Sequence, residues 1–337
     1  MKLFKKILFT IVVVLGVLIV GLIINNRVYN IEYQNVDTKK DYLSEDDINR
    51  VHEIYEYLYD EGNDIFNNID NKALNILLYN DAYEFLFSDF KPIEEEWTYI
   101  GKDEYIDRFT YRRAAKNPQA FAIKVDDTWV GSFATMDTYH MTMLREIPIL
   151  YPPQFIIADE QYYKALIIHE MVHAYQGNYN SNRVDDAEHI HNVCSSYYTD
   201  SRFNALIERE ANYLEIALLA DDTDTVQKNV QLFLETRLQR RKECQLTARE
   251  IHEEQEIEWL EGLARYGEFK ASRDSSSLIA KNLSDISEKV KVKSDDRYYS
   301  LGMAEYMIII KLDKKYEDDI LKKNVVLEDI LYELCMN

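Results

Sequence analysis

Residues 166–176 read LIIHEMVHAYQ, and this stretch decides the interpretation of the whole chain. In a helix, residues four apart lie on one face, so His169 and His173 present their imidazoles to a common point one turn apart. Ile168 and Val172 help to make the helix apolar on most sides, so both imidazoles are expected to be buried, where each needs a partner. A bound metal ion supplies that partner. The stretch therefore predicts a zinc-binding helix.

Glu170 lies between the two histidines in sequence and adds a base to the pair. Zinc lowers the pKa of a bound water toward neutrality, and a carboxylate that does not bind the metal can accept the proton. The residue types thus match a division of labour, with imidazoles as ligands and Glu170 as base. The alternative is an amphipathic helix with two ordinary histidines.

The N-terminus predicts a membrane segment. Lys2, Lys5 and Lys6 precede the apolar residues 7–24, ILFTIVVVLGVLIVGLII, which are long enough to cross a bilayer as a helix. Positive charge before the run predicts a cytoplasmic N-terminus and an extracytoplasmic body. A cleaved signal peptide, and hence a secreted protein, is the alternative, although the following LIINNRVYN lacks the small residues of a typical cleavage site.

Composition limits the possible partners. The chain has 337 residues, a formal net charge of -21 and no dense Lys/Arg cluster beyond residue 30, so nucleic acid is not an expected partner. Only 9 Gly and 5 Pro favour a mostly helical protein. The three cysteines, Cys194, Cys244 and Cys335, do not form a disulfide framework; free thiols are expected, with a Cys194–Cys244 bond as the alternative.

Periodicity places a small sheet before the histidine helix and helices after it. Strands are expected at residues 73–79, 120–125, 128–134 and 154–159, with a tight turn at Asp126-Asp127. Helices are expected from Ser44 to Leu58, from 160 to a C-cap at Gly177, and over 201–220, 223–243 and from Thr247, where Glu250 completes a capping box; residues 178–200 and 271–296 are expected to be polar loops.

These motifs resemble those of a known group of enzymes. LIIHEMVHAYQ looks like the active-site helix of zincin-type HExxH metallopeptidases, and specifically of the gluzincins, whose third zinc ligand is a glutamate on a later helix. The resemblance covers residues 70–310 through short motifs only. It implies a zincin-like α+β fold, mostly helical, in which a small N-terminal sheet and a helical C-terminal subdomain enclose a cleft.

The resemblance offers two positions for the third ligand. Glu261 in EWLEGLARYGE is similar to the W-L-x-E-G-[FL]-A-x-Y segment of aminopeptidase-type gluzincins, although 87 residues separate it from His173, more than those enzymes use; an inserted helical hairpin at 201–243 would account for the difference. Glu208, which 34 residues separate from His173, resembles the E-x-x-x-D segment of thermolysin-like enzymes with Asn212 in place of Asp, and Glu210 is a variant of that idea.

Other residues fit a peptidase more loosely. Tyr299, at the start of an apolar helix, is a candidate to stabilise a tetrahedral oxyanion. The hairpin of 120–134 is a candidate edge for binding an extended peptide, or else a core hairpin. His189 and His191 form either a secondary metal site or a solvated pair.

The sequence as a whole predicts a membrane-anchored, extracytoplasmic zinc metallopeptidase that acts on a peptide or protein. Its expected parts are a cytoplasmic tip and anchor (1–27), a tether (28–42) and a metallopeptidase-like domain (43–337), which divides into a sheet with the active-site helix (43–177) and a helical subdomain (178–337). The alternative functions are a non-catalytic surface binding module on the same fold and a hydrolase for another amide or ester.

Overall fold

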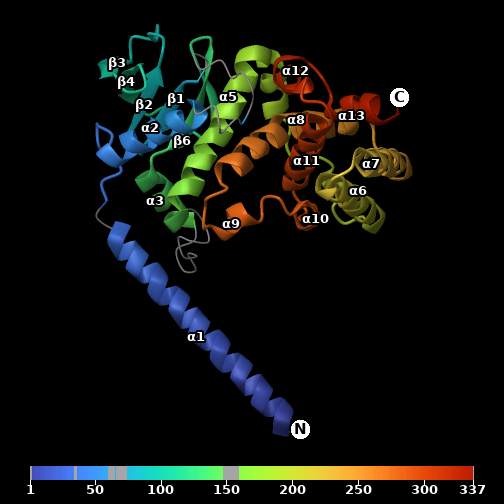
Figure 1. Cartoon of the computed structure of the whole chain (residues 1–337). Helices are drawn as coiled ribbons and strands as arrows, with labels where there is room; N and C mark the ends of the chain where they lie inside the picture. The colour runs from blue at the N-terminus through green and yellow to red at the C-terminus, as the bar shows by residue number, and fades with distance from the viewer. Residues whose placement is uncertain (1, 34–35, 60–64, 66–73, 147–158, 337) are drawn as a thin grey trace.

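The computed structural model describes residues 2–33, 36–59, 65, 74–146 and 159–336. The fold is α+β, with 62% helix, a small mixed sheet and one N-terminal apolar helix, as the sequence predicts. Figure 1 shows the sheet and the long helix α5 on one side of the body and the later helices on the other. The expected strand at 154–159 lies outside the described residues except for Asp159, which is the N-cap of α5.

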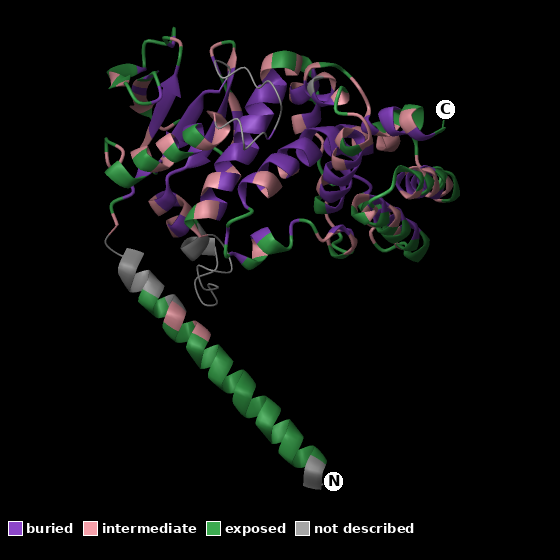
Figure 2. Ribbon diagram, in the orientation of Figure 1, coloured by how far each residue is buried: buried purple, intermediate pink, exposed green. Residues whose placement is uncertain are grey.

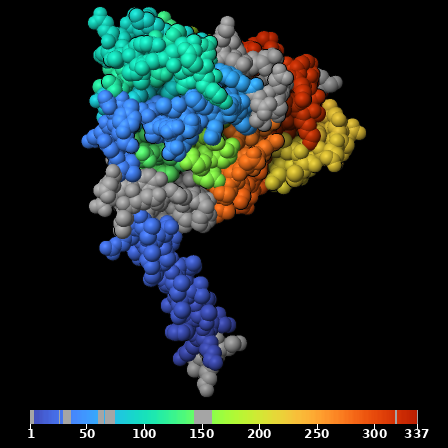
Figure 3. Space-filling model, turned by 60° about the vertical axis from the view of Figure 1, so that its left-hand side comes forward, coloured from blue at the N-terminus to red at the C-terminus, as the bar shows by residue number. Residues whose placement is uncertain are grey.

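Helix α1 (Lys2–Tyr33) extends away from the body (Figures 1 and 3). Its segment Phe4–Asn25 has a mean hydropathy of 3.3, and is long and apolar enough to span a membrane or to be a signal sequence. Figure 2 shows this helix in the green of exposed residues. The helix runs past residue 27 to Tyr33, so the first part of the expected tether is helical.

Six strands form one sheet in the order β3-β4-β2-β1-β6-β5. Only β1 and β6 pair in parallel; the other neighbours are antiparallel. The strands are β1 (Ile76–Tyr79), β2 (Tyr83–Ser88), β3 (Thr98–Asp103), β4 (Arg108–Ala114), β5 (Phe121–Val125) and β6 (Thr128–Ala134). Strand β5 therefore forms one edge of the sheet.

The sequence pattern located part of this sheet. The strands β1, β5 and β6 and the turn at Asp126-Asp127 are confirmed. Strands β2, β3 and β4 were not predicted. In β3 and β4, partial exposure and the Lys and Arg among the apolar residues hide the alternation of polar and apolar side chains. Side chains alternate across the sheet: Ile76 and Leu78 face the main core with α5, whereas Leu77 faces a smaller core with Trp97.

Helix α5 (Glu160–Glu188) lies against β6 and carries both histidines. The expected C-cap at Gly177 is wrong, because Gly177 is buried inside the helix: an added Cβ there would come within 2.5 Å of the Trp129 indole. The glycine thus permits close packing instead of ending the helix. The helix kinks at Asn180, which has non-helical dihedral angles, and continues to Glu188, so residues 178–188 of the expected polar loop are helical.

The helices from α6 onward build the other half of the body, whereas α2 and α3 lie on the side of the sheet (Figure 1). Ser44 caps α2, as predicted, and Thr247 and Glu250 form the predicted capping box of α8. The expected loop at 271–296 contains two short helices, α9 and α10. The helices are α2 (Glu45–Tyr59), α3 (Met136–Glu146), α6 (Ser201–Leu219), α7 (Thr223–Glu243), α8 (Ala248–Ala271), α9 (Leu278–Lys281), α10 (Ile286–Lys289), α11 (Asp296–Leu312), α12 (Tyr316–Lys322) and α13 (Leu327–Met336).

Helix α8 is the central element of this half, and Figure 2 shows it, like α5, mainly in the purple of buried residues. It crosses α11 where two glycines meet: a Cβ on Gly262 would lie 2.6 Å from Gly302, and a Cβ on Gly302 would lie 2.1 Å from the carbonyl oxygen of Glu258. Side chains at this crossing are therefore excluded, and the absence of a side chain at Gly262 and Gly302 lets the two helices approach closely.

Candidate metal centre

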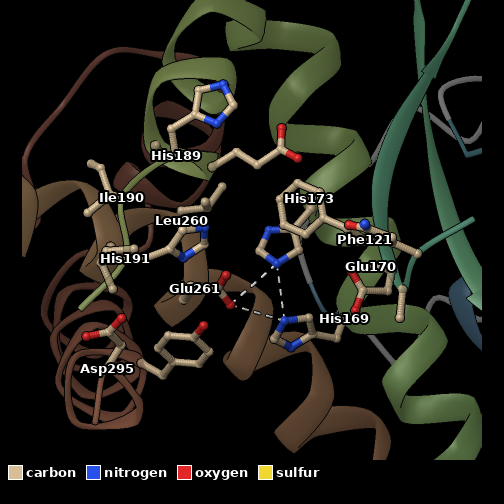
Figure 4. Close-up of a pocket in the computed structure, with 16 residues that line it drawn as sticks. Phe121, His169, Glu170, His173, His189, Ile190, His191, Leu260, Glu261 and Asp295 are labelled. Atoms are coloured by element: carbon tan, nitrogen blue, oxygen red, sulfur yellow. Dashed lines mark hydrogen bonds and ion pairs between the residues drawn. The ribbon is translucent and has the colours of Figure 1, made fainter. Parts of the chain in front are cut away.

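Helices α5 and α8 bring three predicted ligands together. The Nε2 atoms of His169 and His173 are 3.1 Å apart, and Glu261 Oε2 lies 3.3 Å from the first and 3.5 Å from the second. Figure 4 shows the three side chains pointing toward one another. All three residues are buried.

The spacing of these atoms suits a small tetrahedral metal ion. With ligand distances of about 2.0–2.1 Å and tetrahedral angles, Zn²⁺ separates neighbouring ligand atoms by about 3.4 Å. The three edges of 3.1, 3.3 and 3.5 Å lie close to that value. Two imidazoles and one carboxylate are also a donor set that zinc accepts. The site is therefore a good fit for zinc with three protein ligands and one open position.

The Nδ1 atom of each histidine lies within hydrogen-bond distance of an acceptor oxygen, and this contact selects one tautomer. His169 Nδ1 lies 3.2 Å from Glu268 Oε2, and a carboxylate can only accept a hydrogen bond when ionised. Glu268 is itself anchored by the hydroxyl of Tyr162, which donates to Oε1 at 2.7 Å. The proton of His169 is thereby drawn to Nδ1, and the lone pair of Nε2 faces Glu261.

Gln176 does the same for the second histidine. Its Oε1 lies 3.1 Å from His173 Nδ1, while its Nε2 donates to the backbone carbonyls of Trp259 at 3.0 Å and Leu260 at 3.2 Å. Because the amide nitrogen is occupied on α8, the amide oxygen faces His173. The lone pair of His173 Nε2 therefore also faces the ligand triangle.

The charges of the site support ligand roles. Burial raises the pKa of Glu261, but the two histidines overcome this and hold that pKa well below its usual range. Burial lowers the pKa of His169, yet Glu261 and Glu268 outweigh it and raise the value to about 10. Glu261 is thus ionised, and a metal ion entering the site would compete with a proton on His169.

Glu170 lies next to the three candidate ligands, and one of its two carboxylate oxygens has no hydrogen-bond partner among the described residues. Its Oε2 is buried and makes no hydrogen bond to any described residue. Burial raises the pKa of Glu170. A buried carboxylate oxygen without a partner is energetically costly, and Glu170 lines the cavity beside the three candidate ligands. The arrangement fits a group that accepts a proton from a molecule in the cavity.

The ligands form one side of a cavity of about 410 Å³. Phe121 at the start of β5 lines it and packs its ring 4.9 Å from the His173 ring. Tyr299 from α11 also lines it, and burial, followed by the charge of Glu261, raises the pKa of Tyr299, so its hydroxyl remains a donor. Figure 4 shows His189 and His191 across the cavity from the ligands. Neither belongs to the group of residues that could bind a metal, within the described chain.

The other glutamates considered as third ligand lie elsewhere. Glu208 is exposed on α6. Glu210 is buried, but its Oε1 accepts from Arg240 Nε at 2.6 Å and its Oε2 lies 3.2 Å from Arg237 Nε. It belongs to a buried ion network of Glu210, Arg237, Arg240, Arg241, Glu254, Glu258, Glu305 and Glu328. The hairpin of α6 and α7 stands between α5 and α8 in the chain, as expected for the longer spacing to Glu261.

Sequence reasoning did not find the residues behind the histidines. Gln176 is three residues after His173, and Glu268 is seven residues after Glu261, on the same face of its helix. Both spacings are visible in the sequence, but a polar residue at such a position is common in a chain with 60 acidic residues. No family model matches the chain, and no curated protein or solved structure matches it. A functional conclusion must therefore rest on the site itself.

Proposed function

We propose that the protein is a zinc metallopeptidase with a zincin-like fold of the gluzincin type, anchored to a membrane by α1. The observation that carries the proposal is the triangle of His169 Nε2, His173 Nε2 and Glu261 Oε2 with edges of 3.1–3.5 Å, next to the unpartnered Oε2 of Glu170. A purely structural cluster has no need of a buried carboxylate oxygen without a partner.

Each residue has a distinct task in this proposal. Zinc at such a site supplies Lewis acidity to a substrate carbonyl and to water. Glu170 Oε2 accepts the proton of the attacking water and passes it to the amide nitrogen that leaves. Tyr299 donates a hydrogen bond from its hydroxyl to the oxygen on which negative charge develops. Glu268 and Gln176 orient the two histidines.

Strand β5 offers a place for the substrate backbone. It is an edge strand, and Gln119, Ala120 and Phe121 at its start line the cavity. An extended peptide can pair with the free edge of such a strand. The proposed substrate is accordingly a peptide or a flexible protein segment.

The proposed location of the protein rests on α1 and on the three lysines in the first two turns of this helix. Lys2, Lys5 and Lys6 favour a cytoplasmic N-terminus, which places the body and its cavity outside the cytoplasm. A cleaved signal sequence would release the same body instead. Fractionation of cells and the N-terminal sequence of the mature protein distinguish the two.

The test combines metal content with hydrolysis. Full-length protein in detergent is purified as wild type, Glu170→Gln, Glu261→Ala and Glu208→Ala, and zinc per chain is measured by elemental mass spectrometry. Cleavage of a peptide library is followed in parallel by mass spectrometry. We expect one zinc per chain in wild type, in Glu170→Gln and in the exposed control Glu208→Ala, and loss of zinc in Glu261→Ala.

Hydrolysis separates the candidate functions. Glu170→Gln should keep zinc and lose cleavage, because the amide cannot accept a proton. Zinc without cleavage of any peptide by wild type would instead support the non-catalytic binding module. Cleavage that survives unchanged in Glu170→Gln would refute the mechanism, and folded wild-type protein that binds no zinc would refute both functions.

A further inference from the structure

One wall of the cavity has no task in the proposed mechanism. It consists of Glu188 at the end of α5, the following residues 189–191, and Asp295 at the start of α11, and we call it the far wall. The kink at Asn180 precedes this last part of α5. Figure 4 shows His189 and His191 of this wall on the opposite side of the view from Glu170 and Phe121.

Asp295 fixes the far wall in place. Its Oδ2 accepts a hydrogen bond from the backbone N–H of Asn192 at 2.7 Å, and its Oδ1 accepts one from the Tyr198 hydroxyl at 2.9 Å. The backbone N–H of Ile190 donates to the carbonyl of Ala187 at 3.0 Å, which closes the turn after α5. The wall is therefore a built part of the cavity, held to α11 by side-chain and backbone hydrogen bonds.

The charge of the cavity is one-sided. Among the described residues that line it there are four carboxylates, those of Glu170, Glu188, Glu261 and Asp295, and no lysine or arginine. A divalent zinc ion offsets Glu170 and Glu261, which leaves the two carboxylates of the far wall uncompensated. The carboxylate of Glu188 has no hydrogen bond or ion pair with any other described residue, so it is available to a ligand.

A second observation shows that this cavity is made for a ligand. Glu170 lines the same cavity and is only 9% exposed, and its Oε2 has no hydrogen-bond partner among the described residues. The volume of about 410 Å³ also lies within the usual range for ligand sites, about 300–1,000 Å³. An acidic wall inside a ligand-sized cavity attracts cations and repels anions.

We propose that Glu188 on the far wall binds a positively charged nitrogen of the substrate, so that the cavity selects basic peptides over acidic ones. The nitrogen is either the ammonium of a lysine, or the guanidinium of an arginine, or the α-ammonium of the peptide N-terminus, since all three donate hydrogen bonds to a carboxylate. As a statement on specificity it rests on the proposed peptidase function, but the binding step can be measured without hydrolysis.

The experiment measures peptide binding to full-length, zinc-loaded Glu170→Gln protein in detergent by fluorescence anisotropy. The probes are labelled peptides of one sequence that carry lysine, norleucine or glutamate at each position in turn, with the N-terminus either free or acetylated. We expect a cationic peptide to bind about tenfold more tightly than its neutral counterpart, because a hydrogen bond to a charged group is involved. The preference should weaken as salt is raised.

The variants assign the effect to one carboxylate. Glu188→Gln should abolish the preference, whereas Asp186→Asn, which removes the same charge from an exposed side chain on α5 outside the cavity, should retain it. A preference for lysine identifies a side-chain subsite, and a preference for the free N-terminus identifies an exopeptidase-like subsite; both support the proposal. Equal binding of cationic, neutral and acidic peptides overturns it.

Failure of this proposal differs from failure of the proposed function. If wild type cleaves peptides without regard to charge and Glu188→Gln leaves binding unchanged, the peptidase stands and the far wall has no such role. If no peptide is cleaved but the cationic preference is present and depends on Glu188, the far wall stands and the cavity belongs to a binding module.

Discussion

A substitution at the crossing of α8 and α11, which lies beside Glu261, should disturb the candidate metal site without changing any of its proposed ligands. Gly302→Ala places a Cβ 2.1 Å from the carbonyl oxygen of Glu258 and 2.7 Å from its carbonyl carbon. A carbon and a carbonyl oxygen rarely approach closer than about 3.3 Å, so the two helices must separate locally by roughly 1.2 Å. Both atoms belong to backbone, which cannot swing aside as a flexible side chain can.

This separation has two costs. Overpacking of a well-packed interior costs about 1–3 kcal/mol, and backbone contacts put this case at the upper end, about 3 kcal/mol. Glu261 is three residues after Glu258 on the same helix, so the shift is passed to the ligand triangle. Zinc sites tolerate deviations of only about 0.2 Å in ligand distance, and we therefore expect zinc affinity to fall at least about tenfold.

The assay uses full-length protein in detergent. Thermal unfolding is followed by tryptophan fluorescence, and zinc affinity by competition with a chromogenic chelator. Gly302→Ala should lower the melting temperature by roughly 6 °C, at about 2 °C for each kcal/mol in a domain of this size. Gly21→Ala is the matched control, because an added Cβ there meets nothing within 4 Å. If Gly302→Ala melts and binds zinc like wild type, the helix crossing does not set the position of Glu261.

Three further predictions follow from buried contacts. Glu268→Gln removes the charged partner of His169 and should weaken zinc binding about 10–100-fold in the same chelator competition, so an unchanged affinity would contradict its orienting role. Burial raises the pKa of Glu305, so the folded state keeps a proton that the unfolded chain has already lost; stability should fall as the pH rises from 5 to 8 in wild type, and Glu305→Gln should reduce that decline in urea titrations. Gly177→Ala drives a Cβ into the Trp129 ring at 2.5 Å and should cost about 1–3 kcal/mol in the same titrations, whereas a stability equal to wild type would show that α5 can move off β6.

The sequence predicted the elements whose signals are local. Capping residues and helical periodicity located α2, α6, α7 and α8, and the apolar runs on either side of Asp126-Asp127 located the hairpin. The edge of the sheet escaped detection, because in the sheet β3 pairs only with β4, and β4 only with β3 and β2, and both strands carry charged residues among their apolar ones. Such strands are recognisable only once their partners are known.

The end of α5 shows why a local signal can mislead. Glycine is common just after a helix, and Gly177 was therefore interpreted as a C-cap. Its actual reason lies in a residue 48 positions earlier in the chain, the Trp129 indole, which leaves no room for a side chain. A helix end and a close helix–strand contact call for the same residue, and only the tertiary structure separates them.

The choice among the three glutamates proposed as third ligand also depends on tertiary structure, across a longer stretch of the chain. His169 and His173 are four residues apart, so helical geometry alone brings them together, whereas Glu261 comes from another helix after the α6–α7 hairpin. Sequence could only rank Glu261 against Glu208 and Glu210. What distinguishes them physically is the surroundings of each carboxylate: Glu210 is neutralised by two arginines, Glu208 is in solvent, and Glu261 lies within 3.5 Å of both imidazoles.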